Sequence, residues 1–326
     1  MKYWVISLAL VPLGCDFHRD PVDALFEDYI NRVANVQDER ALPLLPNQSV
    51  LLPDKRDLAL SIEPITIGLL DSYELRKCSL FNLIAERNSV LGKVQDQFRE
   101  FDFQIALRKG ITKCLQSEHI STELKTQLNA IYQLKQGQLP RYSANLLFTS
   151  DAMRQQLNGN EWIALNNQIT SGELIRAYGT LNAMIETQDR DSSYNLALHQ
   201  EVFEKVNLMG QLWFSLHNAS KKLARVTEQL QKFDDKIICQ SGRDTTKFRY
   251  LNNVFNHIYI ERVQPYMARL DAHYFKLSPY ITILENTHPE YRYPIRAAHQ
   301  MFRDESLAHV KYWQELFERC GKNVTR

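Results

Sequence analysis

The chain has 326 residues, of which 44% are hydrophobic and 24% charged, and its formal net charge is +1 at pH 7. This length provides a sizeable core in one large or two smaller domains. No run of Lys or Arg is longer than a pair, so we expect no nucleic-acid partner. Glycine and proline are sparse, with 11 of each, and alternating Val/Thr patterns are few, so we predict an all-α fold.

The first 14 residues have the pattern of a secretory signal peptide. Lys2 supplies a positive charge, and a mostly apolar run follows as far as Leu13. A helix needs about 20 apolar residues to cross a bilayer, so this run is too short to be a transmembrane segment. We therefore expect residues 1–14 to direct export and then to be removed.

The junction after this segment resembles the lipobox of bacterial lipoproteins. Gly14 precedes Cys15 with leucine and valine upstream, although Pro12 stands where that class usually has leucine. The resemblance implies that the signal is cut before Cys15 and that this residue is acylated, which anchors the chain to a membrane. The alternative is an ordinary secretory peptide with an incidental cysteine. Asp16 resembles the inner-membrane retention signal of enterobacterial lipoproteins, so we expect a periplasm-facing body on a short tether, residues 15–20.

Four cysteines follow Cys15, and an even number in an exported chain indicates two disulfides with three alternative pairings. We predict Cys78–Cys114 and Cys239–Cys320, because each pair then joins helices within one half of the chain. The alternative is four buried free thiols. The sequence has no Cys-x-x-Cys, so a zinc ribbon or a thioredoxin-like motif is not available.

A helix and an extended segment open the mature chain. Apolar spacing predicts a helix over residues 21–37, with Asp20 as its N-cap and Pro21 as its first residue. In residues 38–64, prolines separate leucine-rich pieces; proline blocks helix formation while the leucines favour burial. We interpret this segment as a strap over the helical body, and the alternative is a recognition segment for a partner.

The most distinctive internal stretch spans residues 67–94, whose apolar spacing suits a buried helix. The run LLDSYELRKCSLFNLIAERNSVLGKV, together with the early DYINRVANV and the strap, resembles the DUF3080 family of uncharacterised proteobacterial lipoproteins. The resemblance extends over the mature chain. It implies an exported, lipid-anchored and helical protein, and it implies no activity. Its most specific residues are Asp71, Cys78, Glu86, Arg87, Asn88, Ser89 and Gly92.

Four residues in this stretch, Glu86, Arg87, Asn88 and Ser89, form a candidate polar site. A carboxylate, a guanidinium, an amide and a hydroxyl together can bind a polar ligand. The alternative is a helix end at which Asn88 and Ser89 satisfy backbone groups while a charged residue pairs with a neighbouring helix. The sequence favours this alternative, because ion-pair networks produce such clusters as readily as functional sites do.

Shorter helical patterns fill the middle of the chain. Residues 95–115 read as one helix, and the next, capped by Ser117 or Ser121, is expected to stop at Gly137 before Pro140. A short helix or an extended piece is expected at 142–148, and a helix at 151–157.

The Asn158-Gly159-Asn160 turn is our predicted boundary between an N-terminal helical region, 21–158, and a C-terminal one, 159–326. Helices are expected beyond the turn at 162–167 and 171–187.

The C-terminal region contains the longest apolar pattern. Between residues 193 and 237 apolar side chains recur at alternating intervals of four and three, and a similar pattern starts at Phe248 after a Ser-Gly turn. We therefore predict a multi-helix bundle containing a long antiparallel hairpin, whose second arm Pro265 should kink or interrupt. A last, aromatic-rich helix is expected over 295–319, clamped to the hairpin tip through Cys320.

The sequence contains no motif of a known catalytic or metal site. It has no GxSxG, P-loop, GxGxxG or HExxH. Glu305 and His309, one helical turn apart, lack the second motif of a di-iron bundle. We expect no metal and no cofactor. Our hypothesis is a structural or adaptor protein of the cell envelope that binds another envelope protein through helical surface. The alternative is an envelope hydrolase or ligand-binding protein with a polar site near residues 86–89.

Overall fold

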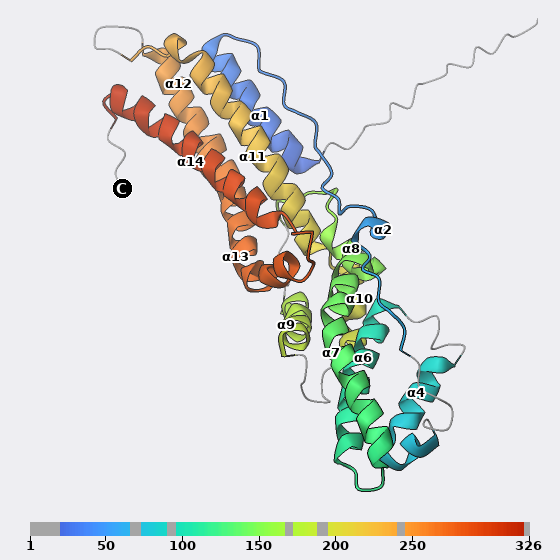
Figure 1. The fold of residues 1–326 in the computed structure, drawn as a ribbon. Helices are drawn as coiled ribbons and strands as arrows, with labels where there is room; N and C mark the ends of the chain where they lie inside the picture. The colour runs from blue at the N-terminus through green and yellow to red at the C-terminus, as the bar shows by residue number, and fades with distance from the viewer. Residues whose placement is uncertain are drawn as a thin grey trace, which may run out of the picture.

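The computed structural model describes residues 20–65, 73–89, 96–166, 172–187, 195–239 and 245–322. These residues form helices joined by loops and by one extended segment, so the predicted all-α bundle is confirmed. Four helical rods, here called the four-helix body, lie side by side in the upper part of Figure 1. They are α1 (Pro21–Gln37), α11 (Leu208–Lys232), α12 (Thr246–Val254) continuing through η4 (Phe255–Val263) into α13 (Gln264–Asn286), and α14 (Ile295–Arg319).

Helix α1 begins where the sequence predicts. The Asp20 carboxylate accepts a hydrogen bond from the Val22 N–H at 2.7 Å, and Pro21 is the first helical residue, where an N–H is not required. Asp38 ends the helix in the left-handed conformation, with φ of 56°. The predicted apolar face is buried: Val22, Leu25, Phe26, Tyr29, Ile30 and Val33.

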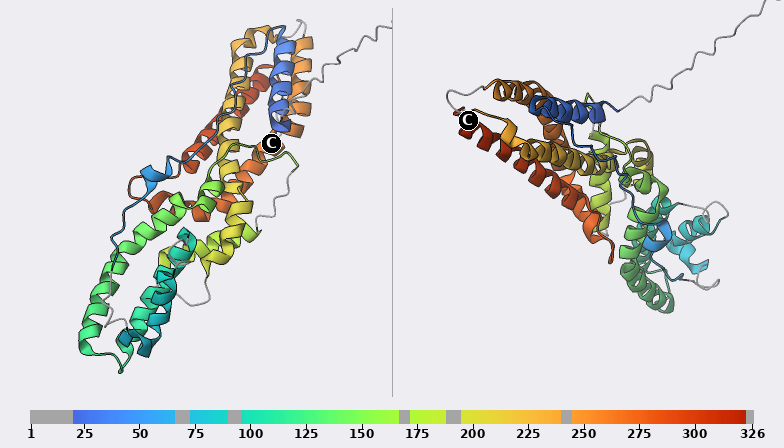
Figure 2. Two further views of the ribbon diagram at one scale, coloured as in Figure 1. Left: turned by 90° about the vertical axis from the view of Figure 1, so that its right-hand side faces the viewer. Right: turned by 90° about the horizontal axis from the view of Figure 1, so that it is seen from above.

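Three rods, α1, α11 and α14, run in one direction (Figures 1 and 2). The fourth rod, α12–η4–α13, is the second arm of the predicted hairpin and runs in the opposite direction. The predicted hairpin is present as two antiparallel arms. However, α11 packs mainly against α14 and α1, and it meets the second arm through α13. The first arm is also shorter than predicted, because the helix breaks at Val206 and Asn207 between α10 (Gln200–Lys205) and α11.

A polar network lies at the centre of the four-helix body. Thr227 Oγ1 donates to the Leu223 carbonyl at 3.0 Å and lies 2.8 Å from His309 Nδ1, so His309 must donate from Nδ1. Its Nε2 is then an acceptor, which receives the Tyr29 O–H at 2.8 Å, while the Trp313 Nε1–H is shared between Nε2 at 3.0 Å and the Tyr29 oxygen at 3.2 Å. Burial lowers the pKa of His309 to about 3, so the ring is neutral, and the network ties α1, α11 and α14 together.

The second hairpin arm changes its hydrogen-bond pattern just before Pro265, which confirms part of the prediction. Residues Phe255–Val263 form a π-helix, η4, between α12 and α13. Pro265 then lies in the first turn of α13, where its missing N–H costs least. The arm is interrupted as an α-helix but stays helical.

The last helix spans the predicted residues, and its aromatic side chains lie in the core. Cys320 follows α14 directly and is bonded to Cys239, which follows η3 (Asp234–Lys236), with the two Cα atoms 5.2 Å apart. This predicted disulfide is confirmed, and it joins the ends of two parallel helices. The buried aromatic residues of α14 are Phe302, Tyr312, Trp313 and Phe317.

A second helical group fills the lower part of Figure 1. Helices α6 (Gln97–Gln116) and α7 (Thr122–Thr149) form an antiparallel pair, covered at one end by η1 (Leu75–Cys78) and α4 (Leu80–Asn88). The predicted Cys78–Cys114 disulfide is confirmed and joins this cover to α6. We call this end the disulfide-linked unit. Its small separate core contains Leu75, Leu80, Leu107, Ile111, Ile120, Leu124 and Leu128.

The prediction that a helix stops at Gly137 is wrong. Ser121 caps α7, but the helix continues through Pro140 to Thr149 and includes the piece expected at 142–148. Leu139 and Ala144, on either side of the proline, are buried, so tertiary packing outweighs the lost backbone hydrogen bond.

The single buried helix predicted over 67–94 is also wrong within the described residues 73–89. Ser79 has a φ of 67° and separates η1 from α4, and Tyr73 is exposed. The remaining parts of that prediction, residues 67–72 and 90–94, lie outside the described residues.

Residues 38–65 form the predicted extended strap, with one short helical turn, α2 (Lys55–Leu58). The strap descends from the top of the four-helix body, past α8 (Asp151–Leu157), to α7 (Figure 1). Within the strap, Val50 and Leu52 are buried, whereas Leu45 and Leu51 are exposed. The strap therefore packs in part, and part of its leucine surface remains accessible.

Side-chain amides bind the strap as a neighbouring strand would. Asn218 accepts from the Gln48 N–H at 2.8 Å and donates to the Gln48 carbonyl at 3.0 Å. Asn145 makes the same two contacts with Leu60, at 2.8 and 2.9 Å. These amides satisfy backbone groups of Gln48 and Leu60 in the place of a neighbouring strand.

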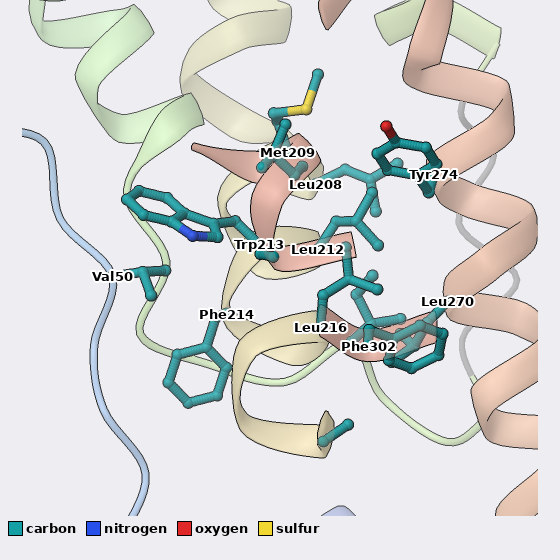
Figure 3. Close-up of a cluster of buried hydrophobic side chains, with 14 of the residues drawn as sticks. Val50, Leu208, Met209, Leu212, Trp213, Phe214, Leu216, Leu270, Tyr274 and Phe302 are labelled. Atoms are coloured by element: carbon teal, nitrogen blue, oxygen red, sulfur yellow. The ribbon is translucent and has the colours of Figure 1, made fainter. Parts of the chain in front are cut away.

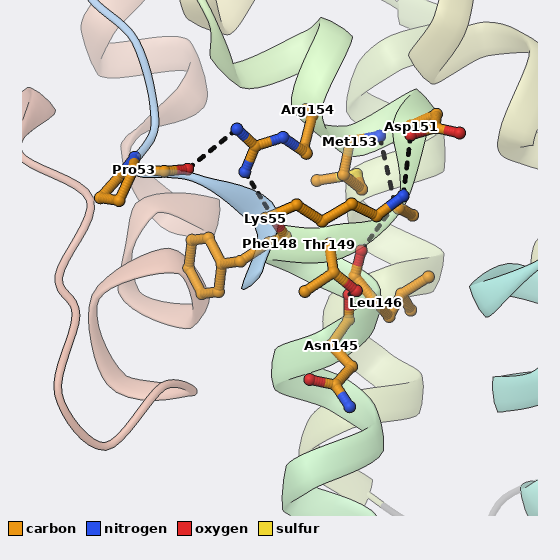
Figure 4. Close-up of polar contacts among 10 residues, drawn as sticks. Pro53, Lys55, Asn145, Leu146, Phe148, Thr149, Asp151, Met153 and Arg154 are labelled. Atoms are coloured by element: carbon orange, nitrogen blue, oxygen red, sulfur yellow. Dashed lines mark hydrogen bonds and ion pairs between the residues drawn. The ribbon is translucent and has the colours of Figure 1, made fainter. Parts of the chain in front are cut away.

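Charged side chains add to the contacts of the strap near α2, as Figure 4 shows. Arg154 donates to the carbonyls of Pro53 and Phe148, at 2.9 and 3.0 Å, and thereby joins the strap to α7 and α8. Lys55 pairs with Asp151 at 3.0 Å on the exposed surface.

The predicted turn at 158–160 is a close packing point. Gly159 exchanges two backbone hydrogen bonds with Val50, both 2.8 Å long, and a Cβ on Gly159 would overlap the Gly210 carbonyl. One hydrophobic core contains residues from both sides of this turn, and Figure 3 shows part of it around Trp213 and Leu216. The two regions thus share this core, and their division at residue 158 stays a prediction.

The remaining elements connect the two groups of helices. Helix α9 (Gly172–Thr187) agrees with prediction, and η2 (Leu196–His199) precedes α10. Residues 162–166 are irregular, contrary to the predicted helix, and the Ile163 N–H bonds instead to Ser215 Oγ at 2.9 Å. No helix among the described residues is long and apolar enough to span a membrane.

Candidate functional site

The structure turns only one of the four predicted polar-site residues inward. Glu86, Asn88 and Ser89 are exposed at the end of α4, and the Ser89 N–H bonds to the Glu86 carbonyl at 3.2 Å. The half-buried Arg87 donates from Nε to Glu100 Oε2 at 2.8 Å. This geometry agrees with the helix-end alternative, in which a charged residue pairs with a neighbouring helix.

Arg87 belongs to a charged cluster between α4, α6 and α7 that consists of Arg87, Glu100, Gln104, Lys135 and Tyr142. Gln104 Nε2 donates to Glu100 Oε1 at 2.6 Å, and Lys135 Nζ donates to the Tyr142 hydroxyl at 3.3 Å. Lys135 is only 7% exposed, and its burial lowers its pKa, whereas burial raises the pKa of Tyr142 to about 12. Among the described residues no carboxylate lies within ion-pair distance of Lys135, so this buried amine has mainly a phenol as its partner.

Two open clefts adjoin the charged cluster. One, of about 550 Å³, is lined by Glu86, Arg87, Arg99 and Asp102. Burial raises the pKa of Asp102, although its carboxylate accepts the backbone N–H groups of Leu196 and Ala197 at 3.0 and 2.9 Å. This carboxylate therefore holds the start of η2.

The other cleft, of about 540 Å³, lies between α2, α6 and α7 and is lined by Gln97, Glu100, Tyr142 and Asn145. Tyr142, whose hydroxyl accepts a hydrogen bond from Lys135, is therefore accessible from this cleft. The charged residues that line this cleft are Lys55, Arg56 and Glu100.

A larger groove, of about 670 Å³, runs between α13 and α14 on the four-helix body. Phe275 and Leu307 line it, although 58% and 68% of their surfaces are exposed. Leu307 lies off the buried stripe of α14, which includes Phe302, His309 and Trp313. The groove thus presents large apolar side chains to solvent.

A polar contact holds the two walls of this groove together. Asp271 on α13 binds His299 Nε2 at 2.7 Å and Arg303 at 2.9 Å, both on α14. The His299 ring stacks on Tyr274 with centroids 3.5 Å apart. Ser306 does not complete a Ser-His-Asp triad, because it lies two helical turns from His299 and donates to the Phe302 carbonyl.

Among the described residues, no three His, Cys, Asp or Glu side chains are grouped to hold a metal ion. Glu305 lies outside the network of His309. Cys15, the predicted lipid attachment, lies outside the described residues.

Comparison with known families gives one match. The model of the family described as "Protein of unknown function (DUF3080)" matches residues 26–324. The chain belongs to this family. Neither the curated proteins nor the solved structures contain a match. The DUF3080 match covers both the four-helix body and the disulfide-linked unit.

Sequence reasoning missed most of the residues that the structure of this DUF3080 chain brings together. Glu100, Lys135 and Tyr142 lie 13 to 55 residues from Arg87 and share no motif with it. Leu307 did carry a signal, because it falls outside the apolar period of its helix. An apolar residue on the solvent face of a predicted helix is therefore informative.

Proposed function

We propose that this protein is a lipoprotein of the bacterial cell envelope, anchored through acylated Cys15 and facing the periplasm, with Asp16 favouring the inner membrane. The signal pattern in residues 1–14 and the Gly14-Cys15 junction support the anchor. Both disulfides support an oxidising compartment. Mass spectrometry of the native amino-terminal peptide tests this placement, since it should begin at Cys15 and carry acyl chains. An intact precursor would refute it.

We further propose that the body is an adaptor that binds another envelope protein in the α13–α14 groove. The observation that carries this proposal is the pair of exposed side chains, Phe275 and Leu307, lining one groove. An amphipathic helix fits such a surface, because its apolar face can cover both side chains while its polar residues reach Arg303 and Asp304.

Site-specific crosslinking in living cells tests the adaptor role. A photoreactive phenylalanine analogue at Leu307 should give a discrete protein adduct, and Phe275→Glu should abolish it. The matched control places the analogue at Leu198, which is 76% exposed on η2, where Phe275→Glu should change nothing. Equal adducts at both positions, or no effect of Phe275→Glu, would contradict the proposal.

A second candidate function is binding of a small anionic ligand at the charged cluster. Lys135 favours it, because among the described residues this buried amine donates to the Tyr142 hydroxyl and retains further N–H groups from which an anion can accept. Inorganic phosphate, succinate and citrate should raise the melting temperature of the protein. Lys135→Met should remove this stabilisation and Glu86→Gln should leave it unchanged. A shift that persists in Lys135→Met would exclude this site.

A further inference from the structure

The strap contacts the first turn of α1, which is the described part of the chain nearest in sequence to Cys15. Asn47 Nδ2 donates to Asp23 Oδ2 at 2.8 Å. Lys222 on α11 lies 3.0 Å from Asp23 Oδ1 and 3.5 Å from the Leu45 carbonyl. These contacts fix the position of Leu45 relative to the start of α1, and Figure 1 shows the strap beside that end of the helix.

The outer surface of this part of the strap is apolar and uncovered. Leu45 and Leu51 are 55% and 61% exposed, while Val50 and Leu52 point into the body. Leu45 and Leu51 lie six residues apart on this segment, and the residues from Pro46 to Ser49 between them are exposed as well. Pro46 and Pro53 are also exposed on this segment.

The length of the tether determines what can cover this surface. Five peptide steps join Cys15 to Asp20, so an acylated Cys15 holds the start of α1 within about 18 Å of the lipid headgroups. The strap at Leu45 is next to that start. A bilayer is therefore the surface that these leucines meet first.

We infer that Leu45 and Leu51 insert into the membrane interface and orient the body on the bilayer, with α1 and the strap toward the lipid. This inference rests on the proposed lipid anchor. It places α14 and its groove on the side away from the membrane, because α14 lies across the body from α1 (Figure 2). The partner groove would then face the periplasm.

The charges near this surface indicate that the contact is apolar rather than electrostatic. Asp23 is paired with the buried Lys222, and Lys221 binds the Gln48 side chain. Among the described residues, the other basic side chains along this part of the strap are also paired, Arg225 with Glu228 and Lys55 with Asp151, so little net positive charge is left to select anionic lipid. The contact should therefore be insensitive to salt, and each leucine should strengthen interfacial binding about fivefold.

Tryptophan quenching in vesicles tests this inference with the acylated full-length protein. Trp162, Trp213 and Trp313 are at most 8% exposed, so lipid should not quench them. The variants Leu45→Trp and Leu51→Trp are reconstituted in phosphatidylethanolamine–phosphatidylglycerol vesicles, with or without acyl chains brominated near the headgroup. Leu307→Trp, in the α14 groove, is the matched control.

Brominated lipid should remove about half of the added emission of Leu45→Trp and Leu51→Trp at low and high salt, and none from Leu307→Trp. Equal quenching at all three positions, or none at the strap, would overturn the membrane contact. Flotation with the vesicles is measured on the same samples. Protein that does not float refutes the anchor and the contact together. Floating protein whose strap is not quenched refutes the contact alone.

Discussion

The four-helix body and the disulfide-linked unit each contain one disulfide, but the bond has a different part in each. The body has a large aromatic core and a hydrogen-bonded network around His309, and its disulfide joins two helix ends at the surface. The unit has a small core, and its disulfide crosses that core between Cys78 and Cys114. A small core stabilises a fold less, so the covalent bond matters more there.

The first way to test this contrast is to remove each disulfide in turn. Closing a loop of 36 residues contributes about 4 kcal/mol through the unfolded state, so Cys78→Ser with Cys114→Ser should open the unit. Amide hydrogen exchange in α4 should rise about 1,000-fold, while fluorescence of the buried tryptophans should show a folded body.

The matched control is Cys239→Ser with Cys320→Ser. The longer loop of 81 residues contributes about 4.5 kcal/mol by the same argument, but the large core should keep the body folded without it, with exchange rising most at the end of α14. If both double variants open their regions to the same extent, the contrast between the two cores is wrong.

Acid should destabilise the body through His309. Its folded pKa of about 3 lies below the unfolded value of about 6.5, so this residue contributes stability fully above about pH 6.5 and loses it as the pH falls toward 3. The loss should be about 3 kcal/mol at pH 4, measured by urea unfolding with tryptophan fluorescence.

His309→Gln separates this effect from the carboxylates, because an amide keeps a donor and an acceptor but does not titrate. Between pH 7 and pH 4 the free energy of unfolding of His309→Gln should fall by about 3 kcal/mol less than that of the native protein. Identical slopes in both proteins would mean that His309 does not carry the acid sensitivity.

The packing of the strap against the helices should depend on individual side-chain amides. Asn145→Ala removes two hydrogen bonds to Leu60 and should lower the free energy of unfolding by about 2 kcal/mol. Asn145→Asp retains only the acceptor and should lie between Ala and the native residue. Both are measured by urea unfolding and by exchange at Leu60. Unchanged exchange at Leu60 in Asn145→Ala would show that other contacts hold the strap.

The smallest effect is expected at the charged cluster. The Arg87–Glu100 pair is about a quarter exposed, so Arg87→Gln should cost less than about 1 kcal/mol, measured by urea unfolding. Glu86→Gln, on the exposed side of α4, is the control and should cost nothing. A loss well above 2 kcal/mol in Arg87→Gln would make the pair a main support of the unit.

The fold was predictable where local signals and packing agree. Asp20 and Pro21 define the start of α1, and the two disulfides follow from joining helices within each half. Prediction failed at Pro140, where a local helix breaker is overruled by burial of its neighbours, and at Ser79, where a positive φ interrupts an apolar period. Both failures depend on tertiary contacts that spacing does not encode.

The candidate sites were predictable only in part. Arg87 was identified, but its partners Glu100 and Lys135 come from other helices and are neighbours only in space. The α13–α14 groove was likewise missed, because a groove depends on how two helices pack. A residue that breaks an apolar period, such as Leu307, was the one sequence signal that pointed there.

The strap has a consequence for the order in which this protein assembles. The side chains that bind Leu60, Leu52, Gln48 and Leu42 lie 85, 106, 170 and 187 residues later in the chain. During synthesis the strap emerges early, and its leucines have no docking surface until most of the polypeptide has followed. Docking of the strap must then be a late, slow step, and the new chain is most prone to aggregate before it.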